Sequence, residues 1–127
     1  MASLLLWLQL ETLPRDNPHE TDIGHWWVAF DGSNPVGFAG MVQSIRWSDA
    51  GYMCRAGVVR SHRGKGLQKR LIRVRERKAH QLGWNWLVTD TRGNPPSGNS
   101  LISCGFRLFT PSNPWGHEDA IYWRKAL

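Results

Sequence analysis

The chain has 127 residues, of which 41% are hydrophobic and 20% are charged. These proportions are those of a globular domain, and they exclude a disordered tail. Because a chain of this length buries about two-thirds of its unfolded surface around one core, we expect a single domain over residues 1–127. The apolar run at residues 4–10 is too short to cross a bilayer and lacks the features of a signal peptide. The sequence therefore predicts a soluble, cytoplasmic protein without a membrane partner.

The net charge of +6 is concentrated in one segment. Nine of the sixteen Lys and Arg residues lie between positions 60 and 78, where Glu76 is the only acid. This cluster predicts an anionic partner of limited size, or a surface that meets one face of a helix. The two cysteines, Cys54 and Cys104, and the five histidines lack the spacing of metal ligands. We expect neither a metal site nor a disulfide framework.

The first half of the chain predicts strands. Short runs rich in Trp, Val, Ile and Phe occupy residues 4–10, 25–30 and 35–45, and this composition is typical of β-strands. The segment Asp31–Pro35 has the sequence of a turn, so the last two runs should form an antiparallel hairpin. Residues 11–22 contain two prolines and predict a loop or at most a short helix.

The second half predicts a strand–helix–strand unit. A strand over residues 51–59 precedes a helix over 67–82, in which apolar residues form a narrow stripe opposite a basic face. A buried strand follows over 84–91, and a right-handed crossover would place it parallel to the earlier strand. After a short helix, strands are expected over 106–110 and 120–127. The predicted class is α/β with a mixed, mostly antiparallel sheet.

The turn RSHRGKG, residues 60–66, brings basic side chains and two glycines to the start of the predicted helix. The first N–H groups of a helix have no internal partners, and its dipole adds about half a positive charge there. Gly64 and Gly66 remove the Cβ atoms that would keep a phosphate from the backbone. The turn predicts a phosphate site. It is neither a Walker A loop, since Gly66 replaces the hydroxyl residue, nor a Rossmann turn, since Lys69 replaces the third glycine.

This turn resembles the acetyl-CoA signature of the GNAT superfamily of N-acetyltransferases. The signature consists of Arg or Gln, two residues, Gly, one residue, and Gly or Ala. Arg63 and Gly66 match it, whereas Gln68 stands where Gly or Ala is usual. The chain departs from the signature only at this third position.

A second GNAT motif follows at the matching distance. In the family, a strand after the long helix leads to Asn, two residues, and Ala or Ser, and later to Gly-Phe. Here Asn94 and Ser97 precede Gly105 and Phe106. The two motifs cover roughly residues 51–106, so the chain resembles a compact single-domain GNAT acetyltransferase with a GNAT-like sheet.

The resemblance implies acetyl-CoA as co-substrate and no metal. The backbone at the end of the strand before the turn would hydrogen-bond the pantetheine arm. The turn would wrap the pyrophosphate, the next two basic side chains would reach outer phosphates, and the second motif would line the pantetheine end. The cofactor-binding residues so implied are Gly57, Val58, Val59, Arg63, Gly64, Lys65, Gly66, Leu67, Gln68, Lys69, Arg70, Asn94 and Ser97.

The resemblance also implies a direct attack of an amine on the thioester, but the sequence assigns no catalytic residue. Many family members have a Tyr acid where this chain has Leu101. The strand position that often holds a Glu base lies near Tyr52, whose ordinary pKa of about 10 makes it a poor base. Asp49 is a further weak candidate. The catalytic residues therefore stay unassigned, with Tyr52 and Asp49 as candidates.

Three functions are compatible with these features. The first is an acyl-CoA-dependent N-acyltransferase (EC 2.3.1) that acetylates an amine of a small molecule, a peptide or a protein. The second is a basic module that binds nucleic acid, which ranks lower because the RNP, KH and zinc-finger signatures are absent. The third is a GNAT fold that binds CoA with little or no transfer. A homodimer is compatible with each, and the acceptor is not predicted.

Overall fold

The computed structural model describes all 127 residues as one six-stranded sheet with helices on both faces. The strand order is β1-β2-β3-β4-β6-β5, and only the β3–β4 pair is parallel. This confirms the predicted mixed, mostly antiparallel sheet. The elements are α1 (Ala2–Thr12), β1 (His25–Asp31), β2 (Asn34–Gln43), β3 (Ala50–Val58), a 3-10 turn (Arg60–His62), α2 (Leu67–Gln81), β4 (Trp86–Thr91), α3 (Pro95–Ser103), β5 (Arg107–Phe109) and β6 (Ile121–Ala126).

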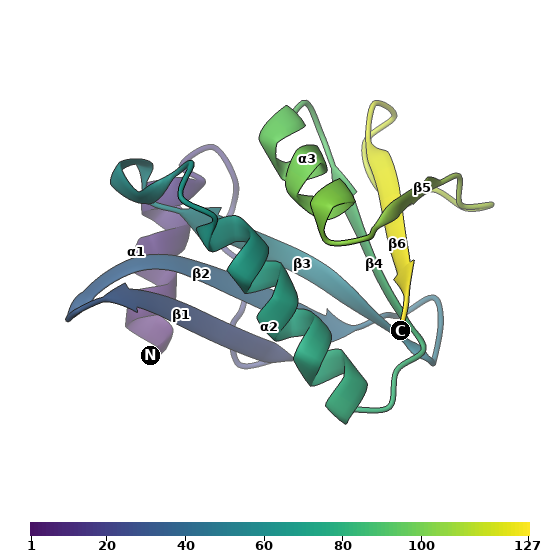
Figure 1. Cartoon of the computed structure of the whole chain (residues 1–127), viewed down its shortest axis with the longest axis horizontal. Coiled ribbons are helices and arrows are strands. Elements are labelled where there is room, and N and C mark those ends of the chain that lie inside the picture. Colours follow the sequence, from purple (N-terminus) through teal and green to yellow (C-terminus); the bar gives the residue numbers. More distant parts are fainter.

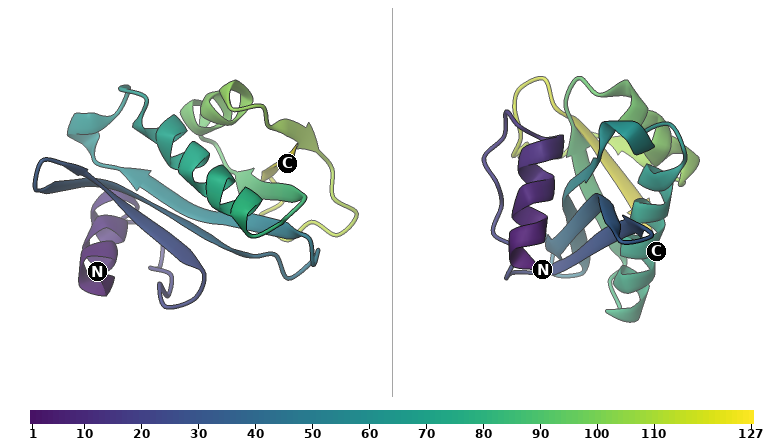
Figure 2. Two further views of the ribbon diagram at one scale, coloured as in Figure 1. Left: turned by 60° about the horizontal axis from the view of Figure 1, so that its bottom comes forward. Right: turned by 90° about the vertical axis from the view of Figure 1, so that its left-hand side faces the viewer.

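The helices divide between the two faces of the sheet. Helix α1 lies on one face, and α2 and α3 lie together on the other (Figures 1 and 2). In Figure 1, β3 and β4 start side by side and separate towards their carboxyl ends. None of the helices has the length and apolarity that crossing a membrane requires.

The first segment differs from its prediction. Residues 4–10 were expected to form a strand, but Ala2–Thr12 forms helix α1. Leu is a strong helix former, and a short apolar run does not by its composition distinguish a strand from a helix that packs on a sheet. Leu5 and Leu8 pack against Phe38 of β2, so one side of α1 covers the sheet. The prediction was wrong because tertiary packing, not composition, decides this segment.

Leu8→Ala is expected to lower the free energy of unfolding by about 2–5 kcal/mol, because a completely buried side chain would leave a cavity. Leu8 has 0% exposure, whereas Leu10 on the outer side of the same helix has 49%. Leu10→Ala is the matched control and should change stability by about 0.5 kcal/mol or less. Urea unfolding followed by circular dichroism measures both values. Equal losses would contradict the burial of one side of α1.

Helix α2 carries most of the core on the other face. Its buried Leu71 and Ile72 face the sheet, as the apolar stripe predicts, and the buried Ala79 lies with them. Two positions differ from that prediction: Leu82 is 40% exposed, and Arg75, expected on the basic outer face, is buried. The burial of Arg75 follows from the helical repeat, since it lies four residues after Leu71 and so on the same side of the helix. Leu82 lies just beyond the last residue of α2, Gln81.

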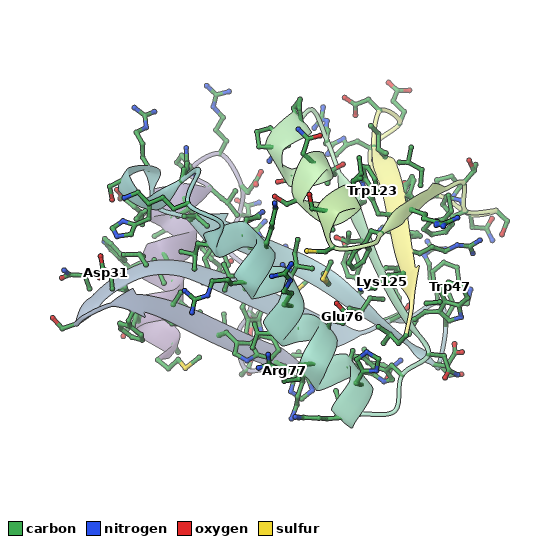
Figure 3. The ribbon with its side chains drawn as sticks, in the orientation of Figure 1. Asp31, Trp47, Glu76, Arg77, Trp123 and Lys125 are labelled. Atoms are coloured by element: carbon green, nitrogen blue, oxygen red, sulfur yellow. The ribbon has the colours of Figure 1, made fainter.

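An ion pair joins α2 to the far half of the sheet. Lys125 of β6 donates to Glu76 of α2, with 2.6 Å between Nζ and Oε1, and the two side chains point towards each other in Figure 3. The Lys125 ammonium also donates to the carbonyl of Cys104 at 2.7 Å. Through these two contacts, Lys125 links β6 to α2 and to the end of α3.

Candidate active site

Strands β3 and β4 diverge after three paired residues. Pairing covers only Ala50–Tyr52 of β3. Just beyond, Met53 and Cys54 stand opposite the single residue Met41 of β2, which is a β-bulge that bends the strand. The hydroxyl of Thr89 on β4 donates to the carbonyl of Met53 at 2.8 Å. This side-chain bond replaces the backbone ladder at the fork, and beyond it the sheet is open.

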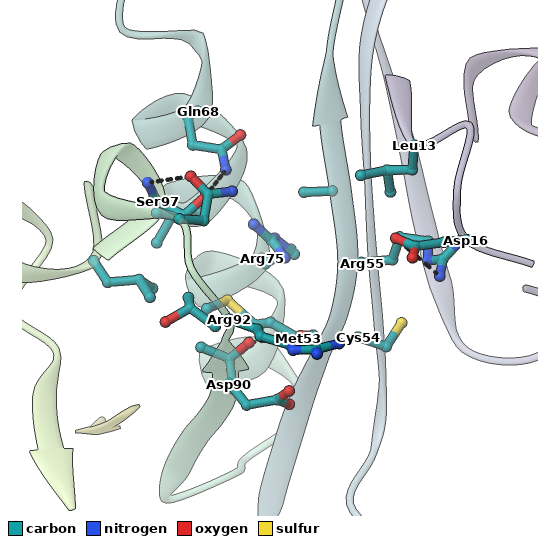
Figure 4. Close-up of a pocket in the computed structure, with 16 residues that line it drawn as sticks. Leu13, Asp16, Met53, Cys54, Arg55, Gln68, Arg75, Asp90, Arg92 and Ser97 are labelled. Carbon is teal, nitrogen blue, oxygen red and sulfur yellow. Dashed lines mark hydrogen bonds and ion pairs between the residues drawn. The ribbon is translucent and has the colours of Figure 1, made fainter. Parts of the chain in front are cut away.

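A cavity of about 280 Å³ occupies the opening (Figure 4). Each wall comes from a different element: Cys54 from β3, Asp90 from β4, Arg75 from α2, Leu101 from α3 and Leu13 from the loop after α1. The fork therefore brings together side chains that are far apart in the sequence.

A groove of about 660 Å³ continues from this cavity to the N-terminus of α2. The two hollows adjoin, because both are lined by Leu13, Ala56, Gln68, Asn94 and Ser97. Three of the predicted cofactor residues, Val59, Lys65 and Arg70, do not line either hollow. The predicted residues that line the groove are Gly57, Val58, Arg63, Gly64, Gly66, Leu67, Gln68, Lys69, Asn94 and Ser97.

The glycine turn has the backbone shape that its sequence predicts. Gly64 and Gly66 have φ values of +73° and +83°, in the region that favours glycine, and a Cβ atom added to either would meet no atom within 4 Å. Gly66 is the N-cap of α2. The Nε of Arg63 donates to the carbonyl of Val58 at 2.9 Å, which ties the turn to the end of β3. The first amides of α2 therefore lie beside open space that an anion can enter.

The second motif forms the opposite wall of the groove. The side chain of Asn94 caps α3 by accepting a hydrogen bond from the N–H of Ser97 at 3.3 Å. Gln68 Nε2 donates to the hydroxyl of Ser97 at 3.4 Å, a contact that crosses from α2 to α3 (Figure 4). Gln68 thus uses the side chain that replaces the usual Gly or Ala to bridge the two walls.

Asp90 is the acid in the cavity that the sequence analysis did not select. Its Oδ1 accepts hydrogen bonds from the hydroxyl of Tyr52 at 2.5 Å and from Trp115 Nε1 at 3.2 Å. Its Oδ2 accepts none from the protein and is open to a ligand. Burial, and then the bond to Asp90, raise the pKa of Tyr52. The Tyr52 phenol therefore stays protonated near neutral pH and positions the carboxylate.

Three other residues were considered for catalysis or stand where a catalytic group is usual: Asp49, Leu101 and Cys54. Asp49 lines neither hollow, and its Oδ2 accepts a hydrogen bond from Asn85 Nδ2 at 3.1 Å, which fastens the chain ahead of β4. Leu101 lines the cavity and is buried, so no proton donor stands at its position. Burial raises the pKa of the Cys54 thiol, which is therefore protonated and a weak nucleophile at neutral pH. Two acids line the cavity, Asp16 on the loop after α1 and Asp90 on β4 at the fork.

The glycine turn at the N-terminus of α2 therefore offers an anion site at one end of a groove, and the other end adjoins the cavity between two diverging parallel strands. The chain belongs to the acetyltransferase (GNAT) family, whose model matches residues 4–106. Members of this family use acetyl-CoA as the co-substrate of acetyl transfer, as the sequence resemblance implies. No curated protein matches the chain in sequence.

Solved acetyltransferases share the fold at low sequence identity. A Bacillus subtilis acetyltransferase in complex with CoA is 17% identical, with a TM-score of 0.82, 100% of this chain covered and 93% of that chain. The IAA acetyltransferase of Bacillus cereus ATCC 14579 is 20% identical, with a TM-score of 0.78 and coverages of 96% and 91%. The ribosomal-protein-S18-alanine N-acetyltransferase of Escherichia coli is 16% identical, with a TM-score of 0.78 and coverages of 98% and 86%.

Proposed function

We propose that residues 1–127 form one acetyltransferase domain that transfers the acetyl group of acetyl-CoA to an amine by direct attack, in class EC 2.3.1. One observation carries this proposal: the groove at the glycine turn and the cavity at the fork adjoin, because five residues line both. A diphosphate held by the amides at Gly66 would place the pantetheine arm along the groove and the thioester at the fork. The acetyl group would then lie beside Asp90.

The cofactor residues take roles that follow from where they lie. The amides at the start of α2 and the turn glycines bind the diphosphate. The ammonium of Lys69, in the groove wall, adds a positive charge beside it. Val59, Lys65 and Arg70 line neither the groove nor the cavity. We therefore assign them to contacts with the outer phosphates or to maintaining the conformation of the turn. The end of β3 at Gly57 and Val58 faces the pantetheine arm from one side, and Asn94 and Ser97 face it from the other.

The carboxylate of Asp90 projects from the face of the sheet opposite α2. Side chains alternate along β4, and Leu87 belongs to the core that includes Ile72 of α2. Thr89 therefore faces α2, and Asp90 faces away from it. We assign to Oδ2 of Asp90 the proton that leaves the attacking amine, because this oxygen is the unoccupied acceptor at the fork.

The acceptor enters past a rim held by side-chain hydrogen bonds. Gln9 exchanges two hydrogen bonds with the backbone of His19, and Arg55 Nη1 donates to the carbonyl of Asn17 at 2.9 Å. These contacts fix the loop after α1 beside the cavity, where Asp16 joins the wall. The rim carries charges of both signs, so it suits an amine on a small molecule or on a peptide.

Calorimetry with acetyl-CoA tests the proposal first, and we expect saturable binding with one site per chain. Incubation with labelled acetyl-CoA and a panel of small-molecule and peptide amines should then release the free thiol and label an acceptor, detected by mass spectrometry. Absence of heat at millimolar acetyl-CoA would overturn the proposal. Binding without transfer to any amine, in lysate as well as in the panel, would instead favour a CoA-binding protein.

A further inference from the structure

Arg75 of α2 is a buried cation without an acidic partner. Its side chain is 4% exposed and lines the cavity at the fork (Figure 4). Nε donates to the carbonyl of Leu71 at 3.0 Å, and Nη1 donates to the carbonyl of Gly40 at 3.5 Å. No carboxylate lies within ion-pairing distance, and Nη2 makes no hydrogen bond to the protein. The guanidinium therefore keeps donor capacity and a full charge at the cavity.

Such a group is costly in the free protein. Desolvation of an unpaired charge disfavours the folded state, and apolar replacements of buried ions are often neutral or stabilising. Burial lowers the pKa of Arg75 to about 10, so the side chain still carries its charge at neutral pH. Leu71, Ile72 and Ala79 make the rest of this helix face apolar. The presence of the Arg75 guanidinium at the cavity is explained if a bound ligand brings a negative charge to it.

Other cations of the cavity wall are already compensated. Arg55 donates to the carbonyl of Asn17 at 2.9 Å and lies 4.0 Å from a carboxylate oxygen of Asp16. Arg92 pairs with Asp119 at 2.9 Å. Both pairs lie towards the rim, where solvent reaches them. Of the three arginines that line the cavity, Arg75 is therefore the one without an acidic partner.

The titratable groups that act on Arg75 are two thiols, and no carboxylate is among them. Cys54 of β3 and Cys104 after α3 interact with the guanidinium, and burial keeps the Cys54 thiol protonated. Asp90, on the opposite side of β4, uses Oδ1 for Tyr52 and Trp115. No anion of the protein pairs with Arg75, so a bound ligand can supply one.

The position of Arg75 indicates which part of the cofactor it meets. Its Cα lies eight residues after Leu67, about 12 Å along α2. The bond to the Leu71 carbonyl shows that the side chain folds back by one turn towards the cofactor turn. The guanidinium thus lies past the diphosphate site, on the α2 side of the fork, whereas Asp90 lies on the other side.

We propose that Arg75 receives the sulfur of CoA and stabilises the thiolate as the acetyl group leaves. This rests on the proposed function. The amine lone pair forms the C–N bond, and the carbonyl π pair moves to oxygen. That pair then re-forms the C=O bond while the C–S bond breaks, and its electrons remain on sulfur as a thiolate. The proton released by nitrogen goes to Asp90, and solvent later protonates the thiolate.

The proposal explains why a charge is buried in the cavity that Leu101 also lines, since Leu101 cannot supply a proton to the leaving group. The thioester sulfur is neutral in the bound substrate, and its negative charge grows only as the C–S bond breaks. A fixed cation at this place therefore interacts more strongly with the transition state than with the substrate, which is the condition for acceleration. Arg75 would be a catalytic residue acting through charge, without proton transfer.

The thiol pKa of bound CoA tests this assignment by a readout that packing alone would not move. Thiolate absorbance in the ultraviolet is titrated for the CoA complex, and the desulfo-CoA complex is subtracted to remove Cys54 and Cys104. Free thiols titrate near about 8.5. In the native protein we expect the bound thiol to titrate at least about one unit lower. In Arg75→Met it should titrate at or above the free value.

Turnover and stability complete the test. Arg75→Met should lower kcat about 10- to 100-fold, bind desulfo-CoA as the native protein does, and melt at the same or a higher temperature. Arg75→Lys should retain part of both the thiol pKa shift and kcat. Arg73→Met, an exposed position on the same helix, is the matched control and should change none of these.

Three results would overturn the proposal. The first is a bound thiol with the pKa of free CoA in the native protein. The second is an unchanged kcat in a folded Arg75→Met variant. The third is a preference for succinyl-CoA over acetyl-CoA that Arg75→Met abolishes, since the anion would then belong to the acyl group. Failure of the proposed function looks different, because the native protein would then either bind neither acetyl-CoA nor desulfo-CoA, or bind both without transferring the acetyl group to any amine.

Discussion

Gly66→Ala should weaken acetyl-CoA binding about 10- to 100-fold. Gly66 is the N-cap of α2, lines the groove and has a φ of +83°. The added methyl group would occupy the open space through which a diphosphate reaches the first amides of the helix. Each hydrogen bond to a charged group that is lost or lengthened costs about 1.5–3 kcal/mol, which corresponds to this range of affinity. Calorimetry with acetyl-CoA measures the change.

Gly83→Ala is the matched control for Gly66→Ala. Gly83 follows the other end of α2 with a φ of +76°, and an added Cβ there also meets no atom within 4 Å. Both substitutions impose left-handed backbone strain of about 1–2 kcal/mol, so their losses of stability should be similar. Only Gly66 lines the groove, so only its substitution should reduce affinity. Equal affinities in the two variants would contradict the placement of the diphosphate at this turn.

The turn could be predicted from sequence because its determinants are local. Two glycines and the start of a periodic apolar stripe fix the left-handed residues and the helix N-terminus within a few positions. The hairpin of β1 and β2 and the β3–α2–β4 crossover were predicted for the same reason. Helix α1 was not, because its identity depends on packing against Phe38, far along the chain. Leu and Trp in so short a run suit either structure.

The chemical groups at the fork depend on contacts between distant residues. The hydroxyl of Tyr52 reaches Asp90 across 38 positions of sequence, and Arg75 reaches the carbonyl of Gly40 across 35. No local sequence pattern predicts these long-range hydrogen bonds. For Arg75 a signal did exist, since its four-residue spacing from Leu71 places it on the apolar side of the helix. The concentration of charge around it favoured the opposite interpretation, a basic outer face.

Asp90→Asn should lower kcat by about 10²–10⁴, the range that general-base catalysis contributes. The amide keeps the size of the side chain and can still accept a hydrogen bond from Tyr52, but it cannot take a proton from the attacking amine. Acetyl-CoA binding should change less than about twofold, because the groove and turn are untouched. Thiol release under saturating acetyl-CoA gives kcat, and calorimetry gives the affinity.

Two further variants separate the roles of the groups around Asp90. Tyr52→Phe removes the hydrogen bond that positions Oδ1 but leaves the carboxylate, so kcat should fall less than about tenfold. Asp49→Asn tests the other carboxylate considered from sequence, which binds Asn85 and lines neither hollow. If Asp49→Asn lost activity while Asp90→Asn kept it, the base would not lie at the fork. If only Asp90→Asn lost activity, the proton would be removed on the face of the sheet opposite α2. The leaving thiolate would then lie on the other side of the cavity at the fork.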